Sequence, residues 1–152
     1  MAISLNTVVP MVHHSRISVP YTWWAGETAS RFLRDLHDRQ TIMGTRCEDC
    51  RRVFVPPRKT CPTCFTNNAT WVTVANEGTL VTFSVARRQL AAIPATIPEV
   101  FGLIRLDGAD TALLHRIDGI DPEHVAIGMR VKACFSRDAG KTIKAISHFE
   151  PV

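Results

Sequence analysis

Four of the five cysteines form two Cys-x-x-Cys pairs, Cys47 with Cys50 and Cys61 with Cys64. Two such pairs about ten residues apart can place four thiolates tetrahedrally around a single metal ion. Zinc is the expected metal, and iron is the alternative, because tetrahedral sites made only of thiolates accept both. The spacing strongly favours a metal site over four buried cysteines with unrelated roles.

The predicted metal site is structural rather than catalytic, because four protein ligands leave no coordination position for water or substrate. Residues 45–66 are rich in Cys, Pro, Arg and Thr, and such a segment needs something other than apolar burial to hold it in place. We therefore expect the metal to supply its folding free energy, on the order of 10 kcal/mol. A catalytic metal is the less favoured interpretation, since no histidine is placed by its spacing to take part.

Basic residues surround the predicted metal site: Arg46, Arg51, Arg52, Arg58 and Lys59. Four thiolates with one divalent ion carry a charge of −2, which lowers the formal net charge of the chain from +4 to +2. These basic side chains either balance the metal centre on a solvated face or bind an anionic ligand, and both interpretations stay open.

The other candidates for chemistry are isolated from one another. Cys134 lies in a segment of alternating polarity without a nearby base, so a buried structural thiol is favoured over a nucleophile. His115 is expected to be a packed or surface residue, because no Ser, His, Asp order matches a catalytic arrangement. We therefore predict no catalytic residue, and a chain that is not an enzyme by itself.

The composition of the 152 residues, 45% hydrophobic and 21% charged, is that of a globular protein. An odd number of cysteines without a secretory signal argues against a disulfide framework. There is also no run of about 18 apolar residues that would predict a transmembrane helix. These observations predict a cytoplasmic protein.

The patterning divides the chain into three predicted parts: an arm and helix over 1–44, a metal ribbon over 45–70 and a β domain over 71–152. Residues 1–20 are expected to form an extended arm that ends at Pro20. A helix is predicted over about 22–40, with Trp23 and Trp24 side by side at its start. Its apolar face follows the helical spacing of Ala29, Phe32, Leu33 and Leu36.

Short strands with a period of two follow Trp71. Val81, Phe83 and Val85 alternate with polar residues, and further strands are predicted near 99–107, 111–117, 129–136 and 142–149. A short helix is expected at Asp121-Pro122-Glu123-His124, which combines an N-cap with a proline in the first turn. Strands of this number with one small helix inserted late predict a closed barrel of the OB type. The predicted fold class is thus mainly β.

The order of these elements resembles an acyl-CoA-associated family that combines a rubredoxin-like zinc ribbon with an OB-fold. The resemblance covers about residues 21–151 and rests on Arg46-Cys47-Glu48-Asp49-Cys50, Pro56-Pro57-Arg58, Cys61-Pro62-Thr63-Cys64, Gly78 to Val85 and Asp118 to Val131. It implies a non-catalytic subunit of a thiolase-type, acyltransferase, aldolase or hydratase complex that acts on acyl-CoA. A two-component thiolase for an unusual acid, such as a benzoylsuccinyl-CoA thiolase, is one setting that it suggests.

The resemblance also suggests which residues bind. Arg87 and Arg88, at the rim of the predicted barrel, would meet the phosphates of a CoA thioester, although a solvated strand end is the simpler interpretation. Trp23 and Trp24 would anchor the thiolase-family partner, or else pack against the ribbon of the same chain. Such a partner would bring its own nucleophile and bases.

One departure from the family concerns the two metal-binding turns. Related ribbons often have glycine just after the second cysteine of each pair, but this chain has Arg51 and Phe65 there. We expect either backbone strain of about 1 kcal/mol at each position or a slightly different turn.

Single-stranded nucleic-acid binding is the alternative function, because zinc ribbons and OB barrels both occur in such binders. The charge distribution argues against it. Residues 1–70 hold nine basic against five acidic residues, whereas residues 71–152 hold nine of each, so the predicted barrel is net neutral.

Overall fold

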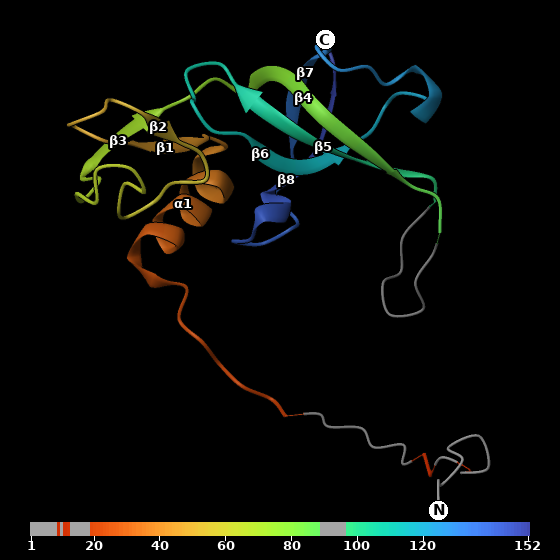
Figure 1. The fold of residues 1–152 in the computed structure, drawn as a ribbon, viewed down its shortest axis with the longest axis horizontal. Helices are drawn as coiled ribbons and strands as arrows, with labels where there is room; N and C mark the ends of the chain where they lie inside the picture. Colours follow the sequence, from red (N-terminus) through yellow and green to blue (C-terminus); the bar gives the residue numbers. More distant parts are fainter. Residues whose placement is uncertain (1–8, 10, 13–18, 89–96) are drawn as a thin grey trace, which may run out of the picture.

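The computed structural model describes residues 9, 11–12, 19–88 and 97–152, so most of the predicted arm over 1–20 lies outside the described residues. A three-stranded sheet in the order β2–β1–β3 lies beside a closed barrel in the order β4–β5–β6–β8–β7 (Figure 1). In chain order the elements are α1 (Gly26–Arg39), β1 (Met43–Arg46), β2 (Val53–Phe54), β3 (Thr70–Thr73), β4 (Glu77–Ala86), β5 (Glu99–Leu106), β6 (Leu113–Ile117), the 3-10 turn η2 (Pro122–His124), β7 (Arg130–Phe135), the 3-10 turn η3 (Ile143–Ala145) and β8 (Ile146–Pro151). The prediction of a mainly β fold with an N-terminal helix is confirmed.

Helix α1 begins four residues later than the sequence pattern predicted. Gly26 has a φ of 81°, a left-handed conformation that no α-helix can continue through. Trp23 and Trp24 therefore lie in the non-helical segment before α1, and the prediction that they open the helix is wrong. At the other end, Gln40 is also left-handed, with a φ of 51°, and its N–H donates to the carbonyl of Asp35.

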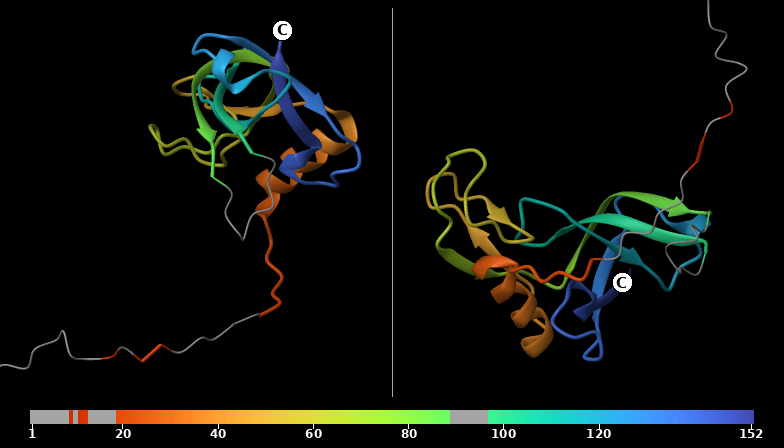
Figure 2. Two further views of the ribbon diagram at one scale, coloured as in Figure 1. Left: turned by 90° about the vertical axis from the view of Figure 1, so that its right-hand side faces the viewer. Right: turned by 90° about the horizontal axis from the view of Figure 1, so that it is seen from below.

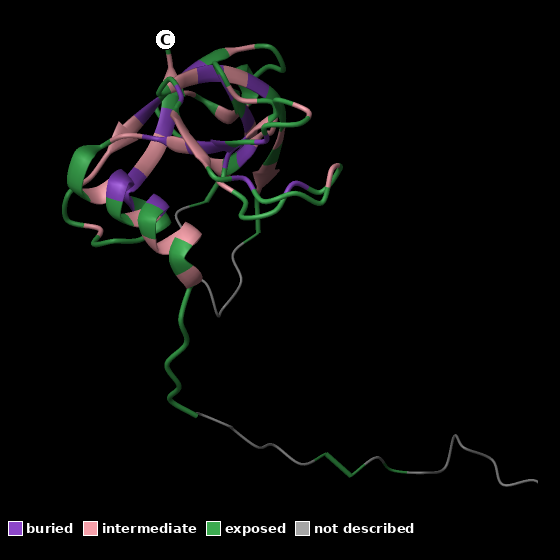
Figure 3. Cartoon of the chain, turned by 90° about the vertical axis from the view of Figure 1, so that its left-hand side faces the viewer, coloured by how far each residue is buried: buried purple, intermediate pink, exposed green. Residues whose placement is uncertain are grey.

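Helix α1 packs against β1 of the ribbon and against η3, which precedes β8 of the barrel (Figure 2). Phe32 and Leu36 are buried, as the helical spacing predicted. Buried and exposed segments alternate along the helix (Figure 3). On an adjoining face, the Arg31 guanidinium lies 4.3 Å from the centroid of the Trp71 ring. In the part of the chain that the structure describes, no helix is long and apolar enough to cross a membrane.

The barrel has the strand order of an OB-fold, with antiparallel pairs except between β6 and β8, which run parallel. A bulge in β4 between Leu80 and Thr82 shifts the register. Because of it, Leu80 is fully buried and Val81 is exposed, so Val81 does not share the inner face with Phe83 as the alternation had predicted.

The segment before β8 also differs from the prediction. A strand was expected over about 142–149, but η3 occupies Ile143–Ala145 and β8 begins at Ile146. The Thr142 side chain accepts a hydrogen bond from the N–H of Lys144, which favours a tight turn over an extended strand at this point.

The ribbon is fixed to the barrel through the Asp110–Thr111 bend between β5 and β6. The Asp110 carboxylate accepts from the N–H of Val53 at 2.8 Å, and the N–H of Asp110 donates to the carbonyl of Val53 at 2.9 Å. The Thr111 hydroxyl accepts from the N–H of Val55 at 2.8 Å and donates to the Val55 carbonyl at 2.9 Å. A loop of the barrel therefore completes the edge of β2.

Candidate metal centre

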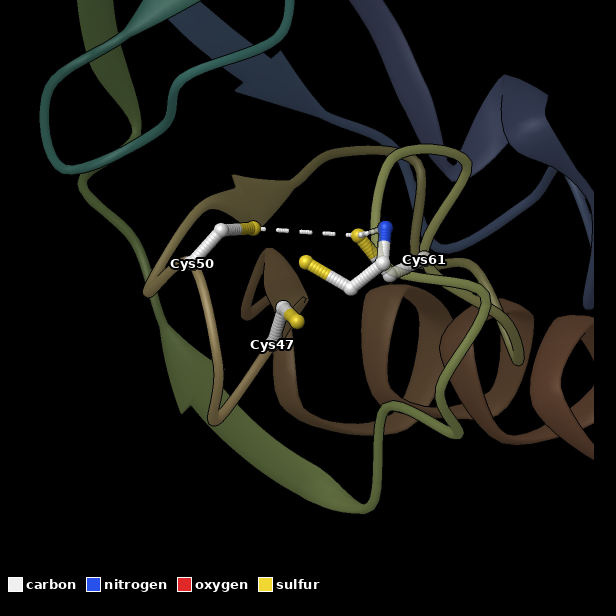
Figure 4. Close-up of side chains that lie close together, drawn as sticks. Cys47, Cys50 and Cys61 are labelled. Carbon is white, nitrogen blue, oxygen red and sulfur yellow. Dashed lines mark hydrogen bonds between the residues drawn. The ribbon is translucent and has the colours of Figure 1, made fainter.

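The four predicted metal ligands meet at one end of the ribbon. Their sulfur atoms all lie within 4.8 Å of one another. Cys47 and Cys61 are fully buried, whereas Cys50 and Cys64 are half-buried. The Sγ atoms of Cys50 and Cys61 are 3.7 Å apart and face a small volume between the two loops (Figure 4). The predicted Cys-x-x-Cys geometry is present.

Each cysteine pair lies on a turn of the same design. The N–H of Cys47 donates to the carbonyl of Arg52, and that of Cys61 donates to the carbonyl of Thr66, both at 2.9 Å. Arg51 and Phe65 are left-handed, with φ values of 61° and 60°. The turns therefore keep the left-handed conformation that glycine would favour and do not adopt a different turn. The expected cost of about 1 kcal/mol at each position stays a prediction.

The thiols of Cys47 and Cys64 have pKa values shifted in opposite directions. The pKa of Cys47 is lowered to about 6, because the backbone N–H of Cys50 and the Thr66 hydroxyl donate to its sulfur. Burial, reinforced by the neighbouring sulfur of Cys50, raises the pKa of Cys64 to about 12. One thiolate forms readily, and further negative charge in the same volume is opposed. A divalent cation removes this conflict because it binds all four sulfurs as thiolates.

The donor set fits zinc, which prefers four tetrahedral Cys ligands in structural sites. The buried cluster around it contains Phe54 besides the two fully buried cysteines, so a bound metal would occupy the middle of the ribbon's own small core. The surrounding Arg46, Arg51, Arg52, Arg58 and Lys59 are all exposed. Thr66 was not singled out from the sequence; its position two residues after Cys64 is the only signal.

Family comparisons agree with this architecture. Residues 34–68 match the family model of the ChsH2 rubredoxin-like zinc ribbon domain, and residues 71–136 match that of the ChsH2 C-terminal OB-fold domain. The fold and the cysteine cluster thus define a protein with a rubredoxin-like zinc ribbon and an OB-fold.

Two archaeal relatives give the family. A DUF35 domain-containing scaffold protein from Methanocaldococcus jannaschii is 30% identical over 108 residues, which cover 70% of this chain and 76% of that protein. A protein of the same name from Pyrococcus furiosus is 25% identical over 103 residues, covering 68% and 74%. The chain belongs to the DUF35 family, which confirms the resemblance seen in the sequence.

Solved structures agree on the fold. The structure of an Ltp2-ChsH2(DUF35) aldolase aligns with a TM-score of 0.63 over 85% of this chain and 98% of that chain, at 23% identity. A DUF35 protein of unknown function from Sulfolobus solfataricus aligns with a TM-score of 0.62 over 83% and 84%, at 21% identity.

The other predicted site residues lie apart from the metal cluster. Arg87 and Arg88 follow β4 at the end of the barrel far from the ribbon (Figure 1). Both are exposed, and the Arg87 guanidinium is paired with the Glu123 carboxylate of η2. Trp23 and Trp24 are 72% and 77% exposed before α1. Their roles in CoA and partner binding stay predictions.

Proposed function

We propose that this chain is a non-catalytic accessory subunit that docks onto a thiolase-family catalytic subunit and helps it to bind acyl-CoA. The observation that carries the proposal is the exposed aromatic group formed by Tyr21, Trp23 and Trp24 on a segment that extends away from the body. Adjacent tryptophan side chains that are exposed to solvent are typical anchors of protein–protein interfaces. The Ltp2-ChsH2(DUF35) aldolase supports it, since its name joins a DUF35 protein with a second component.

Copurification tests the docking step. The full chain, tagged and expressed in its host, should retain a thiolase-family or aldolase partner. The double variant Trp23→Ala/Trp24→Ala should lose the partner while the barrel and ribbon keep their stability, because both side chains lie outside the folded core. Ile127→Ala, which truncates another exposed apolar side chain, is the matched control. Equal retention by both variants would contradict the interface role.

Two arginines are proposed to bind the phosphates of CoA. Arg88 has no ion-pair partner among the described residues, whereas Arg87 must leave Glu123 to reach a phosphate. Glu123→Gln should therefore strengthen acyl-CoA binding by the complex, and Arg87→Ala/Arg88→Ala should weaken it by roughly 10- to 100-fold, as expected for lost charged hydrogen bonds. Calorimetry on the assembled complex measures both. Unchanged affinity in both variants would remove these residues from the site.

A hollow on the barrel suits the thioester end of the ligand. It measures about 530 Å³ and is lined by the apolar side chains of Phe101, Leu114 and Ile143, with Lys144 beside them. His115 also lines it, and burial lowers the pKa of its ring, so the hollow offers a neutral imidazole. Leu114→Asp should raise the KM of the complex for acyl-CoA, and Ile127→Asp should not.

A zinc ion in the ribbon and a cytoplasmic setting complete the proposal. Metal analysis of the purified chain separates zinc from iron, because a four-thiolate ferric site is strongly coloured and a zinc site is not.

Nucleic-acid binding is the outcome that would replace this function. Of the five aromatic residues over 71–152, only Phe101 is exposed, which leaves little surface for stacked bases. Steeply salt-dependent binding of single-stranded DNA or RNA by the pure chain would favour that alternative.

A further inference from the structure

The barrel brings together a second group of metal-ligating side chains, which the sequence pattern did not reveal. Cys134 of β7 and His148 of β8 are directly opposite each other in the antiparallel ladder, and Glu150 lies two residues beyond His148. Residues two apart on a strand project from the same face. One ligand atom from each of the three side chains lies within 4.8 Å of the others, the same limit that the ribbon cysteines meet.

The neighbouring residues leave these donors available. Lys132 is opposite Glu150 in the ladder, but its ammonium group turns to Glu77 at 3.8 Å. Glu150 forms no ion pair within the described part of the chain. The Ser147 hydroxyl lies 2.9 Å from Nδ1 of His148. This contact orients the imidazole ring and leaves its other nitrogen, Nε2, available to bind a metal ion.

We propose that Cys134, His148 and Glu150 bind a divalent transition-metal ion of the zinc class. A thiolate, an imidazole and a carboxylate are donors that zinc and cobalt accept together. The two anionic donors balance the charge of a divalent ion, so binding creates no uncompensated charge on the barrel. This site is separate from the ribbon, because all three ligands come from strands β7 and β8.

The second site differs from the ribbon in the number of protein ligands. Four cysteines close the ribbon site, whereas three side chains leave a fourth position for water or for a donor atom of a bound molecule. Cys134 and His148 are half-buried and Glu150 is exposed, so the ion would exchange with solvent. We therefore expect weaker binding than in the ribbon.

Cobalt binding to the full chain, with the ribbon already loaded with zinc, tests the site. Native mass spectrometry distinguishes the two metals by mass, and visible absorbance reports tetrahedral cobalt. The expected result is one cobalt ion per chain in addition to the ribbon zinc. Cys134→Ser, His148→Gln and Glu150→Gln should each weaken cobalt binding by at least about tenfold, and Ser147→Ala by about tenfold or more through the orientation of the ring.

The matched control is His124→Gln, which removes an exposed histidine of η2, an element outside the two strands that supply the cluster. Cobalt affinity should be unchanged in this variant. Glu150 is exposed, so Glu150→Gln tests the site even if the half-buried Cys134→Ser variant fails to fold. Absence of cobalt beyond the ribbon, or binding that survives all three ligand variants, would overturn the proposal. No partner or acyl-CoA is needed, so the result is independent of the proposed function.

Discussion

The ribbon and the barrel reach a folded state by different physical means. The ribbon's own buried cluster consists of Phe54 with two of the predicted metal ligands, Cys47 and Cys61. The barrel contributes apolar side chains to a larger core, which includes Leu80, Val100, Ile104, Leu106, Leu113, Ile117, Val131, Ile146 and Phe149. We therefore expect metal coordination to take the place of apolar burial in the ribbon, whereas the apolar core of the barrel is large enough to close it without an ion.

Metal removal should separate the two regions most clearly. Chelation, or the variant Cys61→Ser, is expected to unfold the segment between Cys47 and Thr66, because metal ligation contributes on the order of 10 kcal/mol to such a site. Hydrogen exchange should show lost protection there and retained protection in β4 to β8. Ribbon amides that stay protected after complete metal removal would mean that the ribbon folds by packing alone.

The converse variant, Phe149→Ala, should destabilise the barrel and leave the ribbon intact. Phe149 is fully buried and its ring packs edge-on against His115, with centroids 5.7 Å apart. Phe149→Ala should lower the free energy of unfolding by about 3–5 kcal/mol while the ribbon retains its metal. Thermal unfolding and metal content, measured together, check this result. Ile127→Ala on the surface should change stability by less than about 0.5 kcal/mol.

The connection between the regions is the next target. Thr111→Val removes the hydroxyl that satisfies both backbone groups of buried Val55. Leaving a buried polar group unpaired costs about 1–3 kcal/mol, and two such groups are left here, so chemical denaturation should show a loss of about 2–6 kcal/mol. Thr82→Val, at an exposed position of β4, is the control. A loss no greater than that of the control would show that water replaces the Thr111 bonds.

The smallest expected effect is a gain. Arg51→Gly and Phe65→Gly should each stabilise the metal-loaded ribbon by up to about 1 kcal/mol, because glycine removes the strain of a left-handed side chain. Resistance to chelation measures the gain. Arg52 is an exposed neighbour with an ordinary φ, so Arg52→Gly should destabilise the ribbon instead. The same loss in all three variants would contradict the strain.

The features that the sequence predicted correctly are those with a local spacing rule. The two cysteine pairs, the buried positions Phe32 and Leu36, and the N-cap at Asp121 all depend on residues a few positions apart. The left-handed turns at Arg51 and Phe65 were one of two outcomes expected from the resemblance to ribbons that have glycine at these positions.

The features that were missed depend on long-range pairing. The bulge after Leu80 follows from how β4 pairs with β5, and the same pairing places Gly78 of β4 opposite Leu106. A Cβ at Gly78 would lie within van der Waals overlap of the Arg105 carbonyl oxygen, a contact invisible to local patterns. The meeting of Cys134 with His148 likewise depends on the register of two strands.

The Asp110–Thr111 bend has a consequence for how such proteins can be recombined. A chimera joined near residue 70 would take the ribbon from one parent and the barrel from another, and it would separate β2 from the loop that completes its edge. A transplant that carries residues 110 and 111 along with the ribbon should fold where a simple exchange of the two segments fails. The smallest segment set that folds as a ribbon therefore comes from two separate parts of the sequence.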